Sequence, residues 1–203
     1  MARRALDTQV PAEGAEHLVQ GMLCRWGVPT FKAPAFRAIY DLVAINPITK
    51  ASATIQVKSR FQTDCDRGFT IRAERKGADF YVFVFLNMGK WYGNKPNEGI
   101  ADPEFYVLPN KEVAKRVDFD RKMPKLFIRS GDNEMCRFRD AWHLIVAYIE
   151  LDREAILRGE AVATIEGRQR ALDHLFAQDL DFGSWEEAKQ QIQNEVVKQL
   201  EAS

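Results

Sequence analysis

The segment from Asp79 to Asn87, with the sequence DFYVFVFLN, constrains the fold more than any other feature of the 203-residue chain. It is an unbroken series of mostly β-branched and aromatic residues, without the polar–apolar alternation of a strand that faces water on one side. Such a run is typical of a central strand covered on both faces of its sheet. Its apolar part, Phe80 to Leu86, is far too short to cross a bilayer. The sequence therefore predicts a buried strand in a layered fold and no association with a membrane.

The elements around this strand follow the order helix, strands, helices. A helix is predicted from Pro11 to Trp26, because apolar residues recur there at three- and four-residue steps and Gly27 follows at the C-cap. Asn46-Pro47 predicts a turn between strands at 38–45 and 53–59. Further strands are predicted at 69–73 and 104–108, and helices at 111–117, 138–151, 167–178 and 184–200.

The basic and acidic side chains, 29 of each, cancel in number but are unevenly distributed. Residues 1–76 carry twelve Lys and Arg against seven Asp and Glu, whereas residues 151–203 carry six against eleven. A basic front half suits a surface that meets a polyanion. The zero net charge excludes the strong basicity of a non-specific nucleic-acid coat.

Several common site types have no signature in the sequence. Cys24, Cys65 and Cys136 lie far apart with no CxxC spacing, which predicts free thiols and no structural zinc site. No apolar stretch of a secretory signal follows the first arginines, so we expect a cytoplasmic protein. Neither GxGxxG nor GxxxxGK[ST] occurs, and no nucleotide cofactor is expected.

Polar residues occur where a simple core would avoid them. Asp41 interrupts the apolar strand Ile39-Tyr-Asp-Leu-Val. Gln56 and Lys58 lie two residues apart on the next strand, so their side chains share a face, and pairing through the turn brings Asp41 beside them. Burial of a lone carboxylate or ammonium is costly, whereas an arrangement around a cation is not. Glu16 lies at the edge of the apolar face of the first helix, from which it can reach a site on the sheet.

This pattern resembles the PD-(D/E)XK nuclease superfamily, in which a helix with an inward Glu precedes an Asp and then an acidic residue or Gln, any residue and Lys on the next strand. Tyr40-Asp41 and Gln56-Val57-Lys58, with Glu16 upstream, look like its QxK variant, although Tyr40 replaces the Pro. The resemblance covers about residues 11–120. It implies a restriction endonuclease-like α/β core, with a mixed central sheet flanked by helices, over residues 1–125. Residues 126–203 are predicted to form a C-terminal helical extension that packs on the core or forms an interface.

The resemblance also implies metal-dependent hydrolysis of DNA phosphodiester bonds, with Glu16, Asp41, Gln56 and Lys58 as catalytic residues. Asp41, the Gln56 side-chain oxygen and the Val57 carbonyl would hold Mg²⁺, for which Mn²⁺ can substitute, and Glu16 would join directly or through water. Lys58 would orient or activate the attacking water and offset negative charge in the transition state. Gln56 removes one negative charge from the acidic position of the motif.

Each of these residues also has a purely structural interpretation. Asp41 can be a turn or cap residue, Gln56 and Lys58 the solvated face of an edge strand, and Glu16 an exposed helix residue. The weaker charge at Gln56 leaves a second function open. The chain can instead be a non-catalytic module that keeps the fold and binds nucleic acid, or a partner protein in a defence or repair assembly, with the acidic tail as its docking element.

Cationic residues near the proposed site are expected to contact the phosphates of double-stranded DNA. In the loop at 89–95, Lys90 and Trp91 can enter a groove or stack on bases, or fold back as part of an ordinary connection. Cutting both strands of a duplex needs two sites or two events, which makes a homodimer a further hypothesis. The remaining predicted phosphate contacts are Lys50, Arg60, Arg67, Arg72, Arg75 and Lys76.

Overall fold

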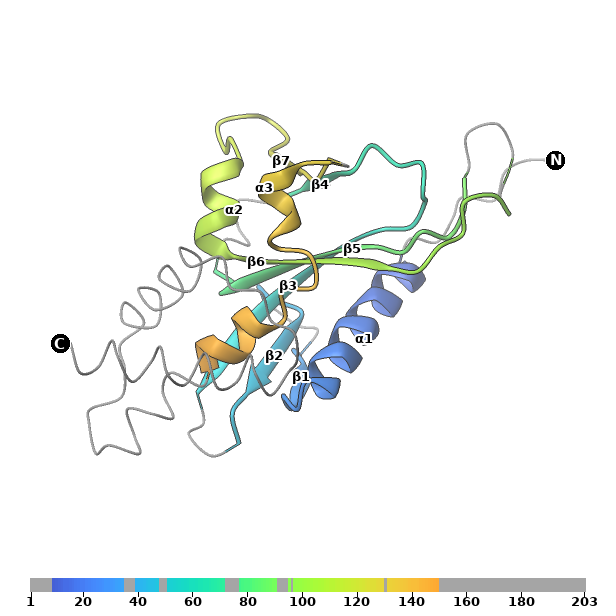
Figure 1. Cartoon of the computed structure of the whole chain (residues 1–203). Helices are drawn as coiled ribbons and strands as arrows, with labels where there is room; N and C mark the ends of the chain where they lie inside the picture. Colours follow the sequence, from blue (N-terminus) through green and yellow to red (C-terminus); the bar gives the residue numbers. More distant parts are fainter. Residues whose placement is uncertain are drawn as a thin grey trace.

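The computed structural model describes residues 9–34, 39–47, 51–71, 77–90, 95, 97–129 and 131–149. One sheet has the strand order β1-β2-β3-β5-β6 (Figure 1). β3 and β5 are parallel and the other neighbouring pairs are antiparallel, so the sheet is mixed, as predicted. Its strands are β1 (Thr30–Lys32), β2 (Leu42–Ile45), β3 (Ser52–Arg60), β5 (Phe80–Phe85) and β6 (Glu104–Pro109).

Other elements cover both faces of this sheet. Figure 1 shows α1 (Gln9–Arg25) and the helical residues 143–149 on one side, and α2 (Asn110–Arg116), α3 (Asn133–Cys136) and a small sheet of β4 (Gly68–Thr70) and β7 (Lys125–Phe127) on the other. Ring contacts agree with this arrangement. Phe80 packs on Tyr148 with 5.3 Å between ring centroids, and Phe83, which faces the opposite side, packs on Phe69 at 4.9 Å. The predicted α/β class is confirmed.

All six residues of β5 are buried, which confirms the prediction of a strand covered on both faces. β5 lies between β3 and β6, so its backbone is hydrogen-bonded along both edges. The middle position of the sheet nevertheless belongs to β3. A continuous apolar run indicates that a strand is buried on both faces. It does not indicate whether that strand is the middle one or the next one along in the sheet.

The first helix is confirmed, and its end follows the predicted glycine cap. Ala15, Val19 and Leu23 of α1 are buried against the sheet. Gly27 has φ of 77°, the left-handed conformation that a residue without Cβ adopts readily. The Val28 N–H donates to the Leu23 carbonyl at 3.0 Å and the Gly27 N–H to the Cys24 carbonyl at 2.9 Å, which together form a Schellman motif.

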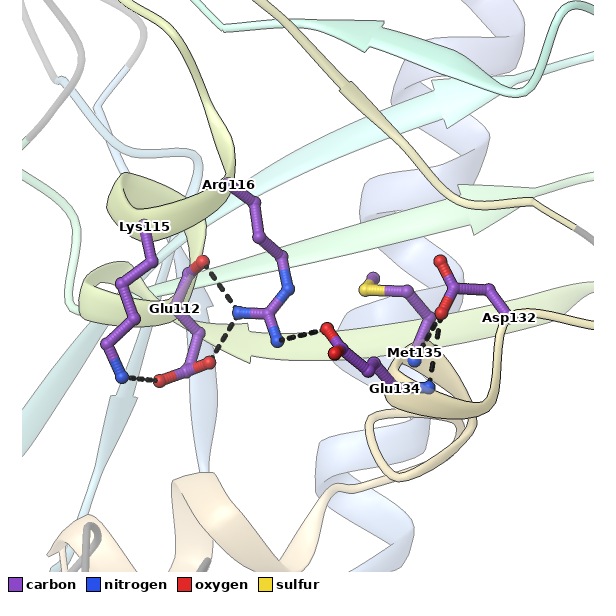
Figure 2. Close-up of polar contacts among 6 residues, drawn as sticks. All are labelled: Glu112, Lys115, Arg116, Asp132, Glu134 and Met135. Carbon is purple, nitrogen blue, oxygen red and sulfur yellow. Dashed lines mark hydrogen bonds and ion pairs between the residues drawn. The ribbon is translucent and has the colours of Figure 1, made fainter.

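Polar contacts link α2 and α3 on their side of the sheet (Figure 2). Arg116 pairs with Glu112 within α2, and its other terminal nitrogen lies 3.7 Å from Glu134 of α3. The Asp132 carboxylate caps α3 by accepting from the backbone N–H groups of Glu134 and Met135 at 3.1 and 3.3 Å. Because the side chain of Glu134 is exposed, the Arg116–Glu134 pair contributes little to stability, and the link mainly orients the two short helices.

Other boundaries differ from the sequence predictions. The helix predicted at 138–151 begins at 143 in the structure, because Arg139 forms a β-bridge to Tyr106 and Asp140 has φ of 50°, neither of which a helix allows. Within the predicted 38–45 strand, residues 39–41 form a bend, and the strand predicted at 69–73 spans only 68–70. The helices predicted at 167–178 and 184–200, with the apolar stripe from Trp185 to Leu200, lie outside the described residues.

Residues from 126–129 and 131–149 contribute to the same core as the sheet, and the predicted division after residue 125 falls inside β7. Leu126 and Trp142 are fully buried. The Tyr148 hydroxyl donates to Asp79 Oδ1 at 3.0 Å, and Asp79 Oδ2 accepts from both the backbone N–H and the hydroxyl of Thr54 at 2.8 and 2.7 Å. The Asp79 carboxylate therefore links the helical residues 143–149 to β3.

The three cysteines are free thiols, as predicted. No helix in the described ranges is long and apolar enough to span a bilayer.

His143 introduces a pH dependence of stability. Burial lowers the pKa of His143 to about 4 from its ordinary 6.5. The folded chain therefore resists protonation, and the stability that depends on neutral His143 is complete above the unfolded-state pKa and is lost as the pH falls towards 4. From pH 7 to pH 5, we expect the unfolding free energy of the wild type to fall by about 2 kcal/mol more than that of His143→Gln. Urea unfolding at both pH values measures this, and equal losses would contradict the assignment.

Candidate metal centre

Asp41 lies where β2 separates from β3. The two strands pair in the register Leu42 with Ile55, so position 41 comes opposite position 56. The Asp41 N–H donates to the Ile55 carbonyl at 2.9 Å. The carboxylate oxygen Oδ2 accepts from the Val57 N–H at 2.7 Å, which is a short, charge-assisted bond. The carboxylate is therefore fixed against the β3 backbone by the fold itself.

The Gln56 amide completes this arrangement and leaves one atom unsatisfied. Gln56 is 1% exposed. Its Nε2 donates to Asp41 Oδ2 and lies 3.4 Å from the Val57 carbonyl oxygen. Its Oε1 is buried and has no hydrogen-bond partner among the residues that the structure describes. An unpartnered buried carbonyl lowers the free energy of unfolding by about 1–3 kcal/mol. Such atoms are rare in folded proteins, so this one requires an explanation.

The donor set fits a hard divalent cation. The amide nitrogen of Gln56 contacts the two oxygens, Asp41 Oδ2 and the Val57 carbonyl, that the sequence analysis predicts as ligands. A half-turn of the amide would point Oε1 at them instead, which is favourable only if a cation lies between the oxygens. Carboxylate, amide and backbone oxygens are the ligands that Mg²⁺ and Ca²⁺ take. In the described ranges no group of three or more His, Cys, Asp or Glu side chains is placed to hold a metal ion, so such a site has to use amide and backbone oxygens as well.

Lys58 follows on the same strand. β3 is regular from Ser52 to Arg60, so Gln56 and Lys58 lie on one face, as expected from the alternation of side chains. Lys58 is half-buried, and its backbone position pairs with Phe83 of the buried strand β5. Asp41 and Gln56 therefore meet on the β2–β3 hairpin, and Lys58 follows Gln56 on the same face of β3.

Glu16 has a different environment. Its Oε2 lies 3.0 Å from Nζ of Lys32 on β1, and Lys32 also donates to Glu13 one helical turn before Glu16. The hydrogen bonds with Glu13 and Glu16 raise the pKa of Lys32, and the hydrogen bond from Lys32 lowers the pKa of Glu13. The charges of Lys32 and Glu13 therefore persist at neutral pH. Sequence reasoning missed Lys32, because a three-residue strand between Pro29 and Pro34 is too short to show a pattern.

The sheet separates Glu16 from Gln56 and Lys58. Paired residues of an antiparallel ladder share a face, so the rungs Lys32–Leu42 and Leu42–Ile55 put Lys32 on the face opposite Gln56 and Lys58. α1 lies on the Lys32 side, where Glu16 meets that lysine. The Ala33 N–H donates to the Asp41 carbonyl at 2.8 Å, so the Lys32 end of β1 still adjoins Asp41. The role of Glu16 as a ligand stays a prediction.

The arginines predicted to bind phosphate make internal contacts. Arg60 donates to the Gly68 carbonyl and lies 3.0 Å from Asp66, and its Nε is buried without a partner in the described part of the chain. Arg67 stacks on Phe85 and pairs with Glu104 at 3.1 Å. A phosphate at Arg67 would have to displace that carboxylate. Sequence reasoning could not predict these internal contacts, because the sequence does not show which arginine side chains the fold buries.

Of the remaining residues predicted to contact nucleic acid, one is described by the structure and lies on its surface. Lys90 is exposed, and its alkyl chain lies over Gly99. Outside the described residues lie Lys50, Arg72, Arg75, Lys76 and Trp91.

Comparison with known proteins gives similarity in structure alone. No protein-family model matches the sequence, and no curated protein does. The chain is similar to a bacterial homing endonuclease, at 18% identity and a TM-score of 0.49, over 73% of this chain and 98% of that one. It is also similar to a Holliday junction resolvase from Archaeoglobus fulgidus, at 15% identity and a TM-score of 0.36, over 58% of this chain and 84% of that one. At this identity neither likeness tells anything about the activity of this chain.

Proposed function

We propose that this chain is a metal-dependent endonuclease that hydrolyses phosphodiester bonds of double-stranded DNA. One observation supports this above all: the buried Gln56 Oε1 lacks a partner beside Asp41, while the amide nitrogen contacts the two predicted ligand oxygens. A residue with only a packing role would gain from an apolar side chain of the same shape. A role as a ligand that turns towards a cation explains why a polar side chain is buried at position 56.

The proposed ligands are Asp41, Oε1 of a rotated Gln56 and the Val57 carbonyl, with Glu16 as a further carboxylate. Mg²⁺ or Mn²⁺ bound there supplies a Lewis acid for the scissile phosphate and lowers the pKa of a bound water. Asp41 keeps its orientation through the Val57 N–H, so this ligand is preorganised by the strand. Asp41 is the proposed ligand that brings a carboxylate from the β2–β3 hairpin, so the affinity should depend strongly on it.

Lys58 is the proposed group that acts on the reacting phosphate. It lies on the Gln56 face, where its ammonium can orient the attacking water and offset negative charge in the transition state. Arg60 continues the same face two residues further along β3, about 7 Å from Lys58 at the usual rise per residue. Arg60, Arg67 and Lys90 are the proposed phosphate contacts among the described residues, and a phosphate would have to displace Asp66 from Arg60 and Glu104 from Arg67. We also propose a homodimer, since a double-strand cut needs two sites or two events, and light scattering tests it.

A non-catalytic binding module is the second candidate. It is favoured by the contacts of Asp41, whose carboxylate accepts from two protein donors, the Val57 N–H and the Gln56 amide. A site that is already satisfied in this way can persist in a fold that no longer cleaves. This candidate predicts DNA binding that is independent of divalent metal.

Incubation of the purified full chain with supercoiled plasmid tests the proposal. We expect nicked or linear DNA with Mg²⁺ or Mn²⁺ and none with EDTA. DNA bound in a gel shift but never cleaved, with either metal, would favour the binding module. Cleavage that persists in EDTA would contradict the metal-dependent mechanism.

Gln56→Glu tests the amide separately. A second carboxylate beside Asp41 adds charge to the proposed ligand set, so we expect the Kd for Mn²⁺ to fall about tenfold. Without metal the two carboxylates repel each other, so the melting temperature in EDTA should fall below that of the wild type. Calorimetric titration and thermal unfolding measure the two effects. An unchanged Kd would mean that Gln56 does not face the cation.

A further inference from the structure

Lys32 lies at the end of β1 that adjoins Asp41, and its side chain contacts α1. Its backbone pairs with Leu42, the neighbour of Asp41, and the next residue, Ala33, donates to the Asp41 carbonyl. Its side chain is 32% exposed and extends to α1, where Nζ lies 3.0 Å from Glu16 Oε2. A cation is therefore built into the α1 face of the sheet, one residue from the backbone contact between Ala33 and Asp41.

The contacts of Lys32 allow Glu16 to be exchanged at little cost. Glu13 and Glu16 are three residues apart on α1, so both carboxylates reach the same ammonium group. If Glu16 turns to another cation, Glu13 still pairs with Lys32. The side chain of Glu16 is 20% exposed and that of Glu13 is 53% exposed, so Glu16 is the partner more shielded from solvent, while Glu13 makes the closer contact with Lys32.

We propose that Lys32 is an internal counter-cation that competes with the divalent metal for Glu16 and thereby sets the metal affinity of the centre. The inference rests on the proposed function. In the metal-free chain Lys32 holds the Glu16 carboxylate and lowers the negative potential near Asp41. Metal binding requires Glu16 to leave Lys32, which then remains paired with Glu13.

Calorimetric titration of the full chain with Mn²⁺, without DNA, tests this inference. We expect Lys32→Met to bind Mn²⁺ about two- to fivefold more tightly than the wild type, which is the range of an exposed ion pair. Lys32→Arg keeps the charge and should bind as the wild type does. Lys95→Met removes a lysine that pairs with Glu98 at 2.9 Å on the β5–β6 connection, and it is the matched control with no expected change.

A double-mutant cycle shows whether Lys32 acts through Glu16. In a Glu16→Gln background, Lys32→Met should give little further increase in affinity. An increase of full size in that background would overturn the competition, and so would unchanged or weaker binding by Lys32→Met alone. Asp41→Asn separates this result from the fate of the proposed function. If Asp41→Asn binds Mn²⁺ as tightly as the wild type, the proposed metal centre itself is wrong. If Asp41→Asn loses binding while Lys32→Met binds Mn²⁺ as the wild type does, the metal centre stands and only the proposed role of Lys32 is overturned.

Discussion

Replacement of Asp41 by asparagine is expected to remove metal-dependent cleavage of plasmid DNA while the chain stays folded. Asparagine has the shape of aspartate, and its side-chain oxygen can still accept from the Val57 N–H. It lacks the negative charge that a divalent cation requires from the Asp41 carboxylate. A bound metal supplies several kcal/mol of transition-state stabilisation, so the rate should fall at least about a hundredfold.

The measurement is the initial rate of plasmid nicking at saturating Mg²⁺, with circular dichroism as the check on folding. Asp118→Asn is the matched control, since Asp118 is an exposed carboxylate that pairs with Arg121 after α2. That variant should cleave as the wild type does. Full activity in Asp41→Asn would exclude Asp41 as a ligand and would place the activity elsewhere or in a contaminant.

Lys58→Met should reduce turnover about a hundred- to a thousandfold, the range for loss of one group that stabilises charge in the transition state. Methionine keeps the length and apolar stem of the side chain, so packing against the strand changes little. Because Lys58 is not a ligand in the proposed centre, calorimetry should find Mn²⁺ binding at or above wild-type affinity. This separates Lys58 from Asp41, whose replacement should abolish both binding and cleavage.

Steady-state kinetics on a short duplex distinguish the role of Lys58 from simple DNA binding. A group that acts in the transition state lowers kcat, whereas a residue that only holds the substrate raises KM. We expect the loss in kcat. Lys115→Met, which breaks an exposed pair with Glu112 on α2, should leave both constants unchanged. A raised KM with normal kcat would assign Lys58 to DNA binding.

Much of the fold could be predicted from local sequence patterns. The buried β5 is visible as an apolar run, and α1 as an apolar stripe that ends at Gly27. Each of these signals comes from residues close together in the chain, so a window of about ten residues contains it. The start of the helical residues 143–149 could not be predicted, because it depends on a bridge between Arg139 and Tyr106, 33 positions earlier.

The proposed metal centre was only partly readable from sequence. Asp41, Gln56 and Lys58 were predicted to meet because a hairpin register is local, and their spacing across one turn is sufficient. The Glu104 partner of Arg67 was not predictable, since the two lie on separate elements and their contact depends on side-chain burial. The partners of Lys32 were not predictable either, since Glu13 and Glu16 lie on α1 and meet Lys32 only when that helix packs beside β1.

The sequence by itself determined the chemistry that is present and the order of the elements, because residue types and short periodicities are properties of neighbouring positions. Only the tertiary structure decided which charges oppose one another. It put Glu16 with Lys32 on one face of the sheet and Gln56 with Lys58 on the other, and it left Gln56 Oε1 buried without a partner in the described residues. Those outcomes depend on strand order and on which layer covers each face, and long-range packing sets both.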